Sequence, residues 1–303
     1  KTDPEKVAAN FDGLARHVLP NGLEIAHLNR HETEYVFKEI FEDQCYLRHG
    51  IHLAADATVI DIGANIGLFS LFVRRRCPQA SVYAFEPSPV AFRALSANCK
   101  TYGPQLTPFN VGVSERRGSA NLTFYDKSSV FSSFHPSADE DRQAIQAVVA
   151  NMVRGELKDA AEPVDAYVNE LMADRLEQQT FECPLLSVSD IIRENQLRRV
   201  DLLKIDAEKC ELEILRGISD EHWPLIAQVV IEVHDRSRRA VAEVQDILTR
   251  RGFQCAVEEE NLLTGSGLFN VYAIRPGNNS HKEKPGELSV MEVQSKADEF
   301  VRA

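Results

Sequence analysis

Residues 59–67 read VIDIGANIG, and this stretch decides the fold. Its apolar first half predicts a buried strand, and the turn that follows contains Gly63 and Gly67 and leads into the helical segment FSLFVRRR at 69–76. A ligand can approach the backbone of such a turn closely, because glycine has no Cβ and the first N–H groups of a helix have no partner within the helix. The stretch therefore predicts a strand, a cofactor-binding turn and a helix in succession.

The same alternation of strand and helix continues along the chain. Strands are predicted at 58–63, 81–86, 106–114, 200–206, 227–234, 253–260 and 268–275. Helices are predicted at 69–76, 89–100, 211–218 and 240–252. Short strands that alternate with helices indicate βαβ units and a parallel sheet, whereas the last two strands follow each other directly. We expect an α/β, Rossmann-like fold with a mostly parallel seven-stranded sheet and an antiparallel edge strand.

The spacing of the glycines discriminates between cofactors. A dinucleotide-binding turn requires GxGxxG, whereas this turn is GxxxG, with Ala64 and Asn65 between its glycines. The carboxylate of Asp61, near the strand end, would repel a pyrophosphate, but it suits the cationic methionyl half of S-adenosylmethionine (SAM), directly or through water. We therefore expect SAM at Asp61, Gly63, Ala64, Asn65 and Gly67. An NAD(P)-dependent oxidoreductase is the alternative.

Two further strand ends complete the expected cofactor site. The second strand ends in Glu86, Pro87 and Ser88, and a carboxylate at that point can accept hydrogen bonds from both ribose hydroxyls. The third strand is followed by Asn110 and Gly112, which would border the adenine. Together with the GxxxG turn, the carboxylate of Glu86 favours SAM over NAD.

These residues lie in segments that resemble the FkbM family of methyltransferases, in the family's order and over roughly residues 37–235. The segments are FKEIFEDQCY, VIDIGANIGLFS, VYAFEPSPVAFRALSANC, NVGVSERRGSANLTFY, Ser132-Ser133-Phe134, VDLLKIDAEKCELEILRG and VVIEVHD. The resemblance implies a class I methyltransferase fold and SAM-dependent O-methylation, often of hydroxyls on polyketides, nonribosomal peptides or sugars. The chain differs from the family where the family usually reads KIDVEGAE, because Lys209 stands in place of the glycine.

Acidic and imidazole side chains should converge near the methyl donor. Ligands of open α/β sheets bind at the carboxyl ends of the strands, where this chain has Asp206 and Glu208 on one strand and Glu232 and His234 on another. We predict His234 as the general base for a hydroxyl acceptor, because its ordinary pKa is near neutral, and Asp206 or Glu232 as the group that orients its ring. Asp206 is also expected to contact SAM. A Mg²⁺ site formed by this cluster with Asp235 is a second interpretation, and we predict no metal.

The sequence divides into a central domain with flanking segments. Residues 55–275 are predicted to form the SAM-binding domain, and 1–54 a helical lid segment that includes the helix ETEYVFKEIFEDQCYL. A helical insertion is expected at about 131–183, and 276–303 reads as a linker and tail. The stripe of the insertion consists of Ile145, Val148, Val149, Met152 and Val153.

The lid segment and the insertion should shape the acceptor pocket, because such additions to a regular βα alternation commonly determine substrate selectivity. We therefore predict Tyr46, Ser132, Ser133 and Glu208 as substrate-binding residues. The expected acceptor is a hydroxyl group on a small molecule or on an intermediate bound to an acyl carrier protein. A catalytically silent SAM-fold interaction domain is a third interpretation, because the turn after the fourth strand departs from the family pattern.

Composition excludes some classes of partner. The 303 residues carry a formal net charge of −12, which disfavours nucleic acid, and no apolar run is long enough for a membrane span. The first residues resemble no secretory signal, so a cytoplasmic location is expected. The six cysteines show no CxxC spacing and are expected to be reduced thiols. The chain begins with Lys1, which suggests a piece of a longer polyketide or peptide synthase, and a homo-oligomer remains open.

Overall fold

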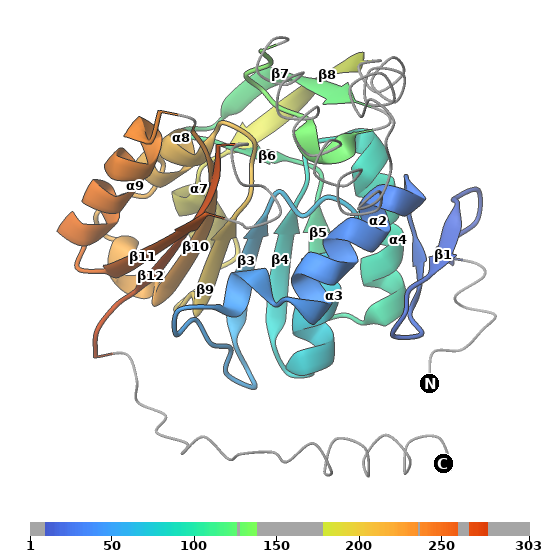
Figure 1. Ribbon diagram of the computed structural model, residues 1–303, viewed down its shortest axis with the longest axis horizontal. Helices are drawn as coiled ribbons and strands as arrows, with labels where there is room; N and C mark the ends of the chain where they lie inside the picture. The colour runs from blue at the N-terminus through green and yellow to red at the C-terminus, as the bar shows by residue number, and fades with distance from the viewer. Residues whose placement is uncertain (1–9, 126–127, 138–177, 236, 260–266, 278–303) are drawn as a thin grey trace, which may run out of the picture.

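The computed structural model describes residues 10–125, 128–137, 178–235, 237–259 and 267–277. Its centre is a seven-stranded sheet with the order β11-β12-β10-β9-β3-β4-β5 (Figure 1). The strands are β3 (Thr58–Ile62), β4 (Ser81–Phe85), β5 (Leu106–Phe109), β9 (Leu202–Ile205), β10 (Gln228–His234), β11 (Gln254–Glu259) and β12 (Leu268–Ile274). The predicted α/β fold with a mostly parallel sheet is therefore confirmed.

The predicted position of the antiparallel strand at the edge of the sheet needs a correction. β12 pairs antiparallel with both β10 and β11, so the antiparallel strand lies one place inside the edge, and β11 is the edge strand. The direct succession of two strands predicts an antiparallel pair, but it does not reveal which of the two inserts next to the parallel strands.

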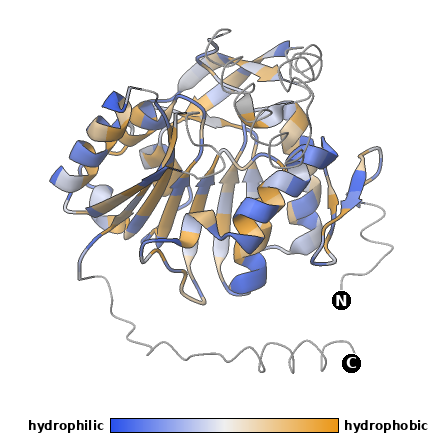
Figure 2. Cartoon of the chain, viewed as in Figure 1, coloured by the Kyte–Doolittle hydropathy of each residue, from blue (hydrophilic) through white to orange (hydrophobic). Residues whose placement is uncertain are grey.

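Two layers of helices cover the sheet because its strands are apolar on both faces. On one side lie α3 (Leu68–Arg76) and α4 (Pro89–Tyr102), and on the other α7 (Val188–Glu194), α8 (Glu211–Arg216) and α9 (Arg239–Arg250) (Figure 1). Successive residues of β3 alternate between the two layers, with Val59 in the core of the first and Ile60 in that of the second. Figure 2 shows apolar residues along the strands and polar residues on the outward faces of the helices.

Helix ends follow from local sequence. Ser88 caps α4, where its hydroxyl accepts from the N–H of Ala91 and Pro89 occupies the first turn. Ser187 and Asp190 form a capping box at the start of α7. Within the described ranges, no helix is both long and apolar enough to cross a membrane.

The N-terminal segment is only partly helical. It holds a hairpin of β1 (Arg16–Val18) and β2 (Glu24–Ala26), then α2 (Arg30–Phe37), the π-helical turn η1 (Lys38–Glu42) and the 3₁₀ turn η2 (Cys45–Leu47). The predicted helix at 32–47 therefore begins earlier and changes its winding after Phe37.

A second, three-stranded sheet was not predicted. It consists of β6 (Gly112–Val113), β7 (Gly118–Tyr125) and β8 (Gln178–Leu186), in the order β6-β8-β7, and lies at the top of Figure 1. The end of the expected helical insertion is therefore a strand, and its beginning is the 3₁₀ turn η3 (Ser129–Phe131). The apolar stripe at Ile145–Val153 and the tail after 277 lie outside the described residues.

Candidate active site

A cavity opens at the carboxyl ends of β3, β4, β9 and β10. The turn after β3, the ends of the other strands, α2, η1 and residues 128–134 contribute its lining. Its lining carboxylates come from elements distant in sequence: Glu32, Glu39, Glu86, Asp206, Glu208 and Glu232. Lys204 and His31 are the basic residues of the lining among the part of the chain that the structure describes. The cavity is therefore strongly acidic.

The glycine turn forms one wall of this cavity. Gly63 has a φ of +71°, and a Cβ added there would lie 1.7 Å from the carbonyl oxygen of Asp206, so no other residue fits. Gly63, Ala64 and Asn65 line the cavity as predicted. Gly67 does not line it, because this residue caps α3 with a φ of +92° and packs against Leu95.

Glu86 faces the cavity from the end of β4. One carboxylate oxygen accepts from the N–H of Asn65 and the other from that of Ser88, both at 2.9 Å. Burial raises the pKa of Glu86 to about 7, although both backbone N–H groups oppose the rise. Pro87 lines the cavity beside it, whereas Ser88 is buried as the cap of α4 and does not.

The structure does not place the two predicted neighbours of the adenine in the cavity lining. The Asn110 amide donates to the carbonyls of Glu86 and Pro87, and Gly112 packs against Leu185, so neither lines the cavity. Their neighbours Val111 and Val113 line it instead. Alternation along an extended segment explains this difference, because a shift of one residue exchanges the two faces.

Asp61 also lies outside the cavity. Its carboxylate is fully buried, accepts a hydrogen bond of 2.7 Å from Ser70 and pairs with Lys204 at 3.1 Å. Asp61 therefore exposes no atom to the cavity, and its link to the site is the ion pair with Lys204.

Asp206 reaches the cavity from the end of β9. Its Oδ2 accepts a hydrogen bond of 2.9 Å from the Tyr46 hydroxyl and lies 3.2 Å from the ammonium of Lys204. Burial, and then the charge of Asp206, raises the pKa of Tyr46 well above its ordinary value, so Tyr46 acts as the donor. Both Tyr46 and Asp206 line the cavity, and Asp206 does not touch His234.

His234 does not fit the role of general base. Its Nδ1 is 2.7 Å from Oε1 of Glu211, and its Nε2 is 2.9 Å from Oε1 of Glu208. Burial lowers the pKa of the imidazole, but Glu208 and Glu211 raise it by more, so the pKa of His234 lies well above its ordinary value. A charged imidazole has no free lone pair that could accept a proton, and His234 is not among the lining residues.

Glu232 lines the cavity next to His234. Its Oε1 is 3.5 Å from Nε2 of His234. Burial, followed by the charge of Asp206, raises the pKa of Glu232 well above its ordinary value. Burial likewise raises the pKa of Glu208, although His234 acts against it. The structure thus brings Glu208, Glu232 and His234 together, with the imidazole as the cation of the group.

The predicted serines close the cavity on the opposite side. Ser132 and Ser133 both line it, and Ser133 donates to the carbonyl of Glu208 at 2.8 Å. The preceding turn is tied to α2, because Glu32 accepts from the Ser129 hydroxyl at 2.9 Å and from the N–H of Val130 at 3.0 Å.

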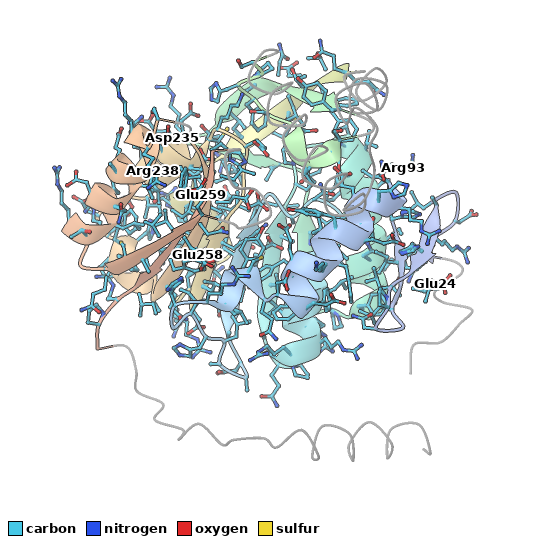
Figure 3. The ribbon with its side chains drawn as sticks, in the orientation of Figure 1. Glu24, Arg93, Asp235, Arg238, Glu258 and Glu259 are labelled. Carbon is cyan, nitrogen blue, oxygen red and sulfur yellow. The ribbon has the colours of Figure 1, made fainter. Side chains whose placement is uncertain are left out.

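Asp235 is not part of the acidic cluster. It lies near Arg238 at the start of α9 (Figure 3), where its Oδ2 accepts from the N–H of Ala240. Within the described ranges, one group has ligand atoms close enough together for a metal ion, and it consists of His135, Cys210 and Glu213. Nε2 of His135 already pairs with Oε1 of Glu213 at 2.8 Å.

Sequence reasoning missed three contributors to the site. Lys204 and Glu211 are buried partners of Asp206 and His234, and Glu32 comes from a helix about fifty residues before Glu86. A buried charge in an apolar strand such as LLKI is a signal for Lys204, because an isolated charge rarely enters a core. No comparable signal marks Glu211 or Glu32, whose partners are distant in the sequence.

Comparisons with known proteins agree with this geometry. The family model described as "Methyltransferase FkbM domain" matches residues 61–255. The 31-O-demethyl-FK506 methyltransferase FkbM of Streptomyces tacrolimicus is 39% identical over 257 residues, which are 85% of this chain and 95% of that protein. Methyltransferase 1 of Beauveria bassiana is 32% identical over 228 residues, which are 75% of this chain and 83% of that protein.

A further relative is much longer than this chain. The AMB antimetabolite synthetase AmbE of Pseudomonas aeruginosa is 40% identical over 265 residues, which are 86% of this chain but 12% of the length of AmbE. The matches favour neither the oxidoreductase nor the silent domain. From the glycine turn, the acidic cavity and the extent of these matches, we conclude that the chain belongs to the FkbM family of methyltransferases and that its reaction is methyl transfer.

Proposed function

We propose that this chain transfers the methyl group of SAM to a hydroxyl group of a small-molecule or carrier-bound intermediate. The observation that carries the proposal is the cavity at the strand ends, where the backbone of Gly63 and the carboxylate of Glu86 form one wall and Asp206 and Glu232 another. The wall with Gly63 and Glu86 suits a nucleoside. The wall with Asp206 and Glu232 suits a cationic group and can take up a proton.

The residues present fit SAM. Each carboxylate oxygen of Glu86 accepts one backbone N–H and has a second lone pair, so two ribose hydroxyls can donate to it. Gly63 lines the cavity without a side chain, so the backbone of the turn is open to a ligand. The carboxylates of Asp206 and Glu232 favour the positive charge of the methionyl half. When bound, SAM supplies an electrophilic methyl group on a sulfonium.

Glu232 is the best candidate for the general base. A hydroxyl acceptor must lose a proton, and a carboxyl whose pKa is raised toward the working pH is a stronger base than an ordinary carboxylate. Glu232 combines a raised pKa with a position on the cavity wall. His234 lies behind it as a fixed cation, which stabilises the ionised form of Glu232 at 3.5 Å.

The relatives support the type of acceptor. The name of the Streptomyces tacrolimicus relative states that it methylates 31-O-demethyl-FK506. The Pseudomonas aeruginosa relative is named as an antimetabolite synthetase, and this chain covers a small part of its length. We therefore propose a natural product of the polyketide or peptide type as the acceptor, presented free or on a carrier protein.

The test is methyl transfer by the purified protein. Labelled SAM is incubated with a panel of free alcohols and hydroxyacyl carrier proteins, and S-adenosylhomocysteine (SAH) and labelled product are quantified. We expect SAH to form only with a hydroxylated acceptor, whereas the matched deoxy compound should give none. If SAM fails to bind in calorimetry, or if no hydroxylated acceptor supports turnover, the proposal is wrong.

A further inference from the structure

Lys204 lies at the centre of the site, but its side chain is almost completely buried. It belongs to β9, between β3 and β10 in the sheet, and its side chain is 3% exposed. Its ammonium lies 3.1 Å from Oδ1 of Asp61, 3.2 Å from Oδ2 of Asp206 and 3.0 Å from the carbonyl oxygen of Gly63. The contact to Gly63 is a hydrogen bond, and the contacts to the two aspartates are ion pairs.

The environment keeps this ammonium charged. Burial lowers the pKa of Lys204, but Asp206 and Asp61 raise it by more, so the pKa lies above its ordinary value. The rings of Tyr46 and Phe69 shield it, with centroids 5.3 Å and 5.9 Å from Nζ. A buried cation in fixed contact with three groups holds those groups at fixed distances from one another.

The contacts of Asp206 show that Lys204 holds one oxygen of its carboxylate. Oδ2 receives both the ammonium of Lys204 and the hydroxyl of Tyr46, whereas Oδ1 makes no hydrogen bond to any residue that the structure describes. Asp206 lines the cavity, and its side chain is 28% exposed. One carboxylate oxygen is thus anchored and the other is available to a ligand.

The third contact ties this carboxylate to the cofactor turn. The carbonyl of Gly63 accepts from Lys204, and the Cα of Gly63 packs against the carbonyl of Asp206 so tightly that no Cβ fits between them. Lys204 therefore joins the end of β9 to the turn after β3 at the point where the proposed methyl donor would bind.

We propose that Lys204 is a positioning residue for methyl transfer, which fixes the free oxygen of Asp206 relative to the glycine turn. This inference rests on the proposed function. It predicts that loss of Lys204 affects the chemical step more than the binding of either substrate, because misplacement by about 1 Å can lower a rate by roughly a hundredfold.

The test uses the double variant Asp61→Asn/Lys204→Met, which removes the cation together with the carboxylate that burial would leave unpaired. We expect kcat to fall roughly a hundredfold, with the calorimetric Kd for SAM and the KM for the acceptor changed less than about fivefold. Ser70→Ala is the control, because it loosens the same buried network without touching Asp206, and its kcat should remain close to that of the parent.

Two further measurements keep the inference falsifiable. If the double variant does not fold, Tyr46→Phe can be used, because it removes the other donor to Oδ2 of Asp206. We expect this variant to lower kcat by roughly tenfold, which is less than the loss expected from the double variant, because Lys204 still holds the same oxygen. A crystal structure of the folded double variant should show the Asp206 carboxylate in a different rotamer.

An unchanged rotamer, an unchanged kcat, or a loss confined to SAM affinity would overturn the positioning role. Absence of SAM turnover by the parent would refute the proposed function instead, and the crystallographic comparison would still test Lys204.

Discussion

Glu86→Gln separates the binding role of this residue from its effect on stability. The pKa of Glu86 rises from 4.5 to about 7 because the carboxyl is buried. The folded protein binds more protons than the unfolded chain between these two pKa values, so its free energy of unfolding falls as the pH rises from about 4.5 to about 7 and levels off above that. The size of the shift corresponds to roughly 3 kcal/mol once the carboxyl is ionised.

Glutamine removes this penalty but also changes the hydrogen bonds. The amide nitrogen of glutamine would face the N–H of Asn65 or that of Ser88, and it cannot accept a hydrogen bond from either. The variant therefore loses one hydrogen bond worth about 1 kcal/mol. We therefore expect the variant to be more stable than the parent by roughly 2 kcal/mol at pH 8 and less stable by about 1 kcal/mol at pH 4.

The affinity for SAM should change in the opposite direction at pH 8. One ribose hydroxyl loses a charged acceptor, which costs about 1.5–3 kcal/mol and weakens binding roughly ten- to a hundredfold. Chemical denaturation and calorimetry on the same samples measure both effects, with Glu115→Gln as the exposed control. Unchanged SAM affinity would refute the ribose assignment, and equal pH dependence of stability in parent and variant would refute the raised pKa.

The remaining predictions concern the turns and the buried imidazole. Gly63→Ala should destabilise the fold by more than about 3 kcal/mol in thermal unfolding, because its methyl group would overlap the carbonyl of Asp206; a small effect would contradict the geometry. Lys209 has a φ of +63° where the family has glycine, so Lys209→Gly should raise the free energy of unfolding by up to about 1 kcal/mol, whereas Lys209→Ala should not. His234→Gln should cost about 3–5 kcal/mol, since it leaves Glu211 buried without its cation. The contribution of His234 is complete below pH 6.5 and is lost as the pH rises through its raised pKa, so parent and variant should converge in strongly alkaline denaturation experiments.

The sequence predicts the central sheet well because its signal is local. Each parallel strand is a short apolar run followed by a turn, as at 58–63 and 200–206, and the structure places strands at both. The strands β7 and β8 were missed because they pair across a gap of more than fifty residues and alternate polar with apolar side chains. A strand of the central sheet is buried on both faces and therefore reads as a continuous apolar run, which is easier to recognise in the sequence than a strand buried on one face.

The candidate site is predictable only in part. Strand ends gave Glu86, Asp206 and Glu232, because the topology brings such ends to one edge. The chemical roles were not predictable, since they depend on partners. His234 has an ordinary pKa near neutral, and only the positions of Glu208 and Glu211 show that it is a fixed cation. Likewise, nothing in the sequence indicates that Asp61 faces Lys204 inside the core and not the cofactor.

The most direct test of O-methylation is the position of the transferred methyl group. SAM that carries a ¹³C-labelled methyl group is incubated with the enzyme and an acceptor that has both a hydroxyl and an amino group, and the product is examined by NMR. We predict that the label appears as an O-methyl group, at a rate that Glu232→Gln lowers by roughly 10²–10⁴-fold. Label on nitrogen or carbon, or a rate that Glu232→Gln does not change, would contradict methyl transfer to a hydroxyl with Glu232 as its base.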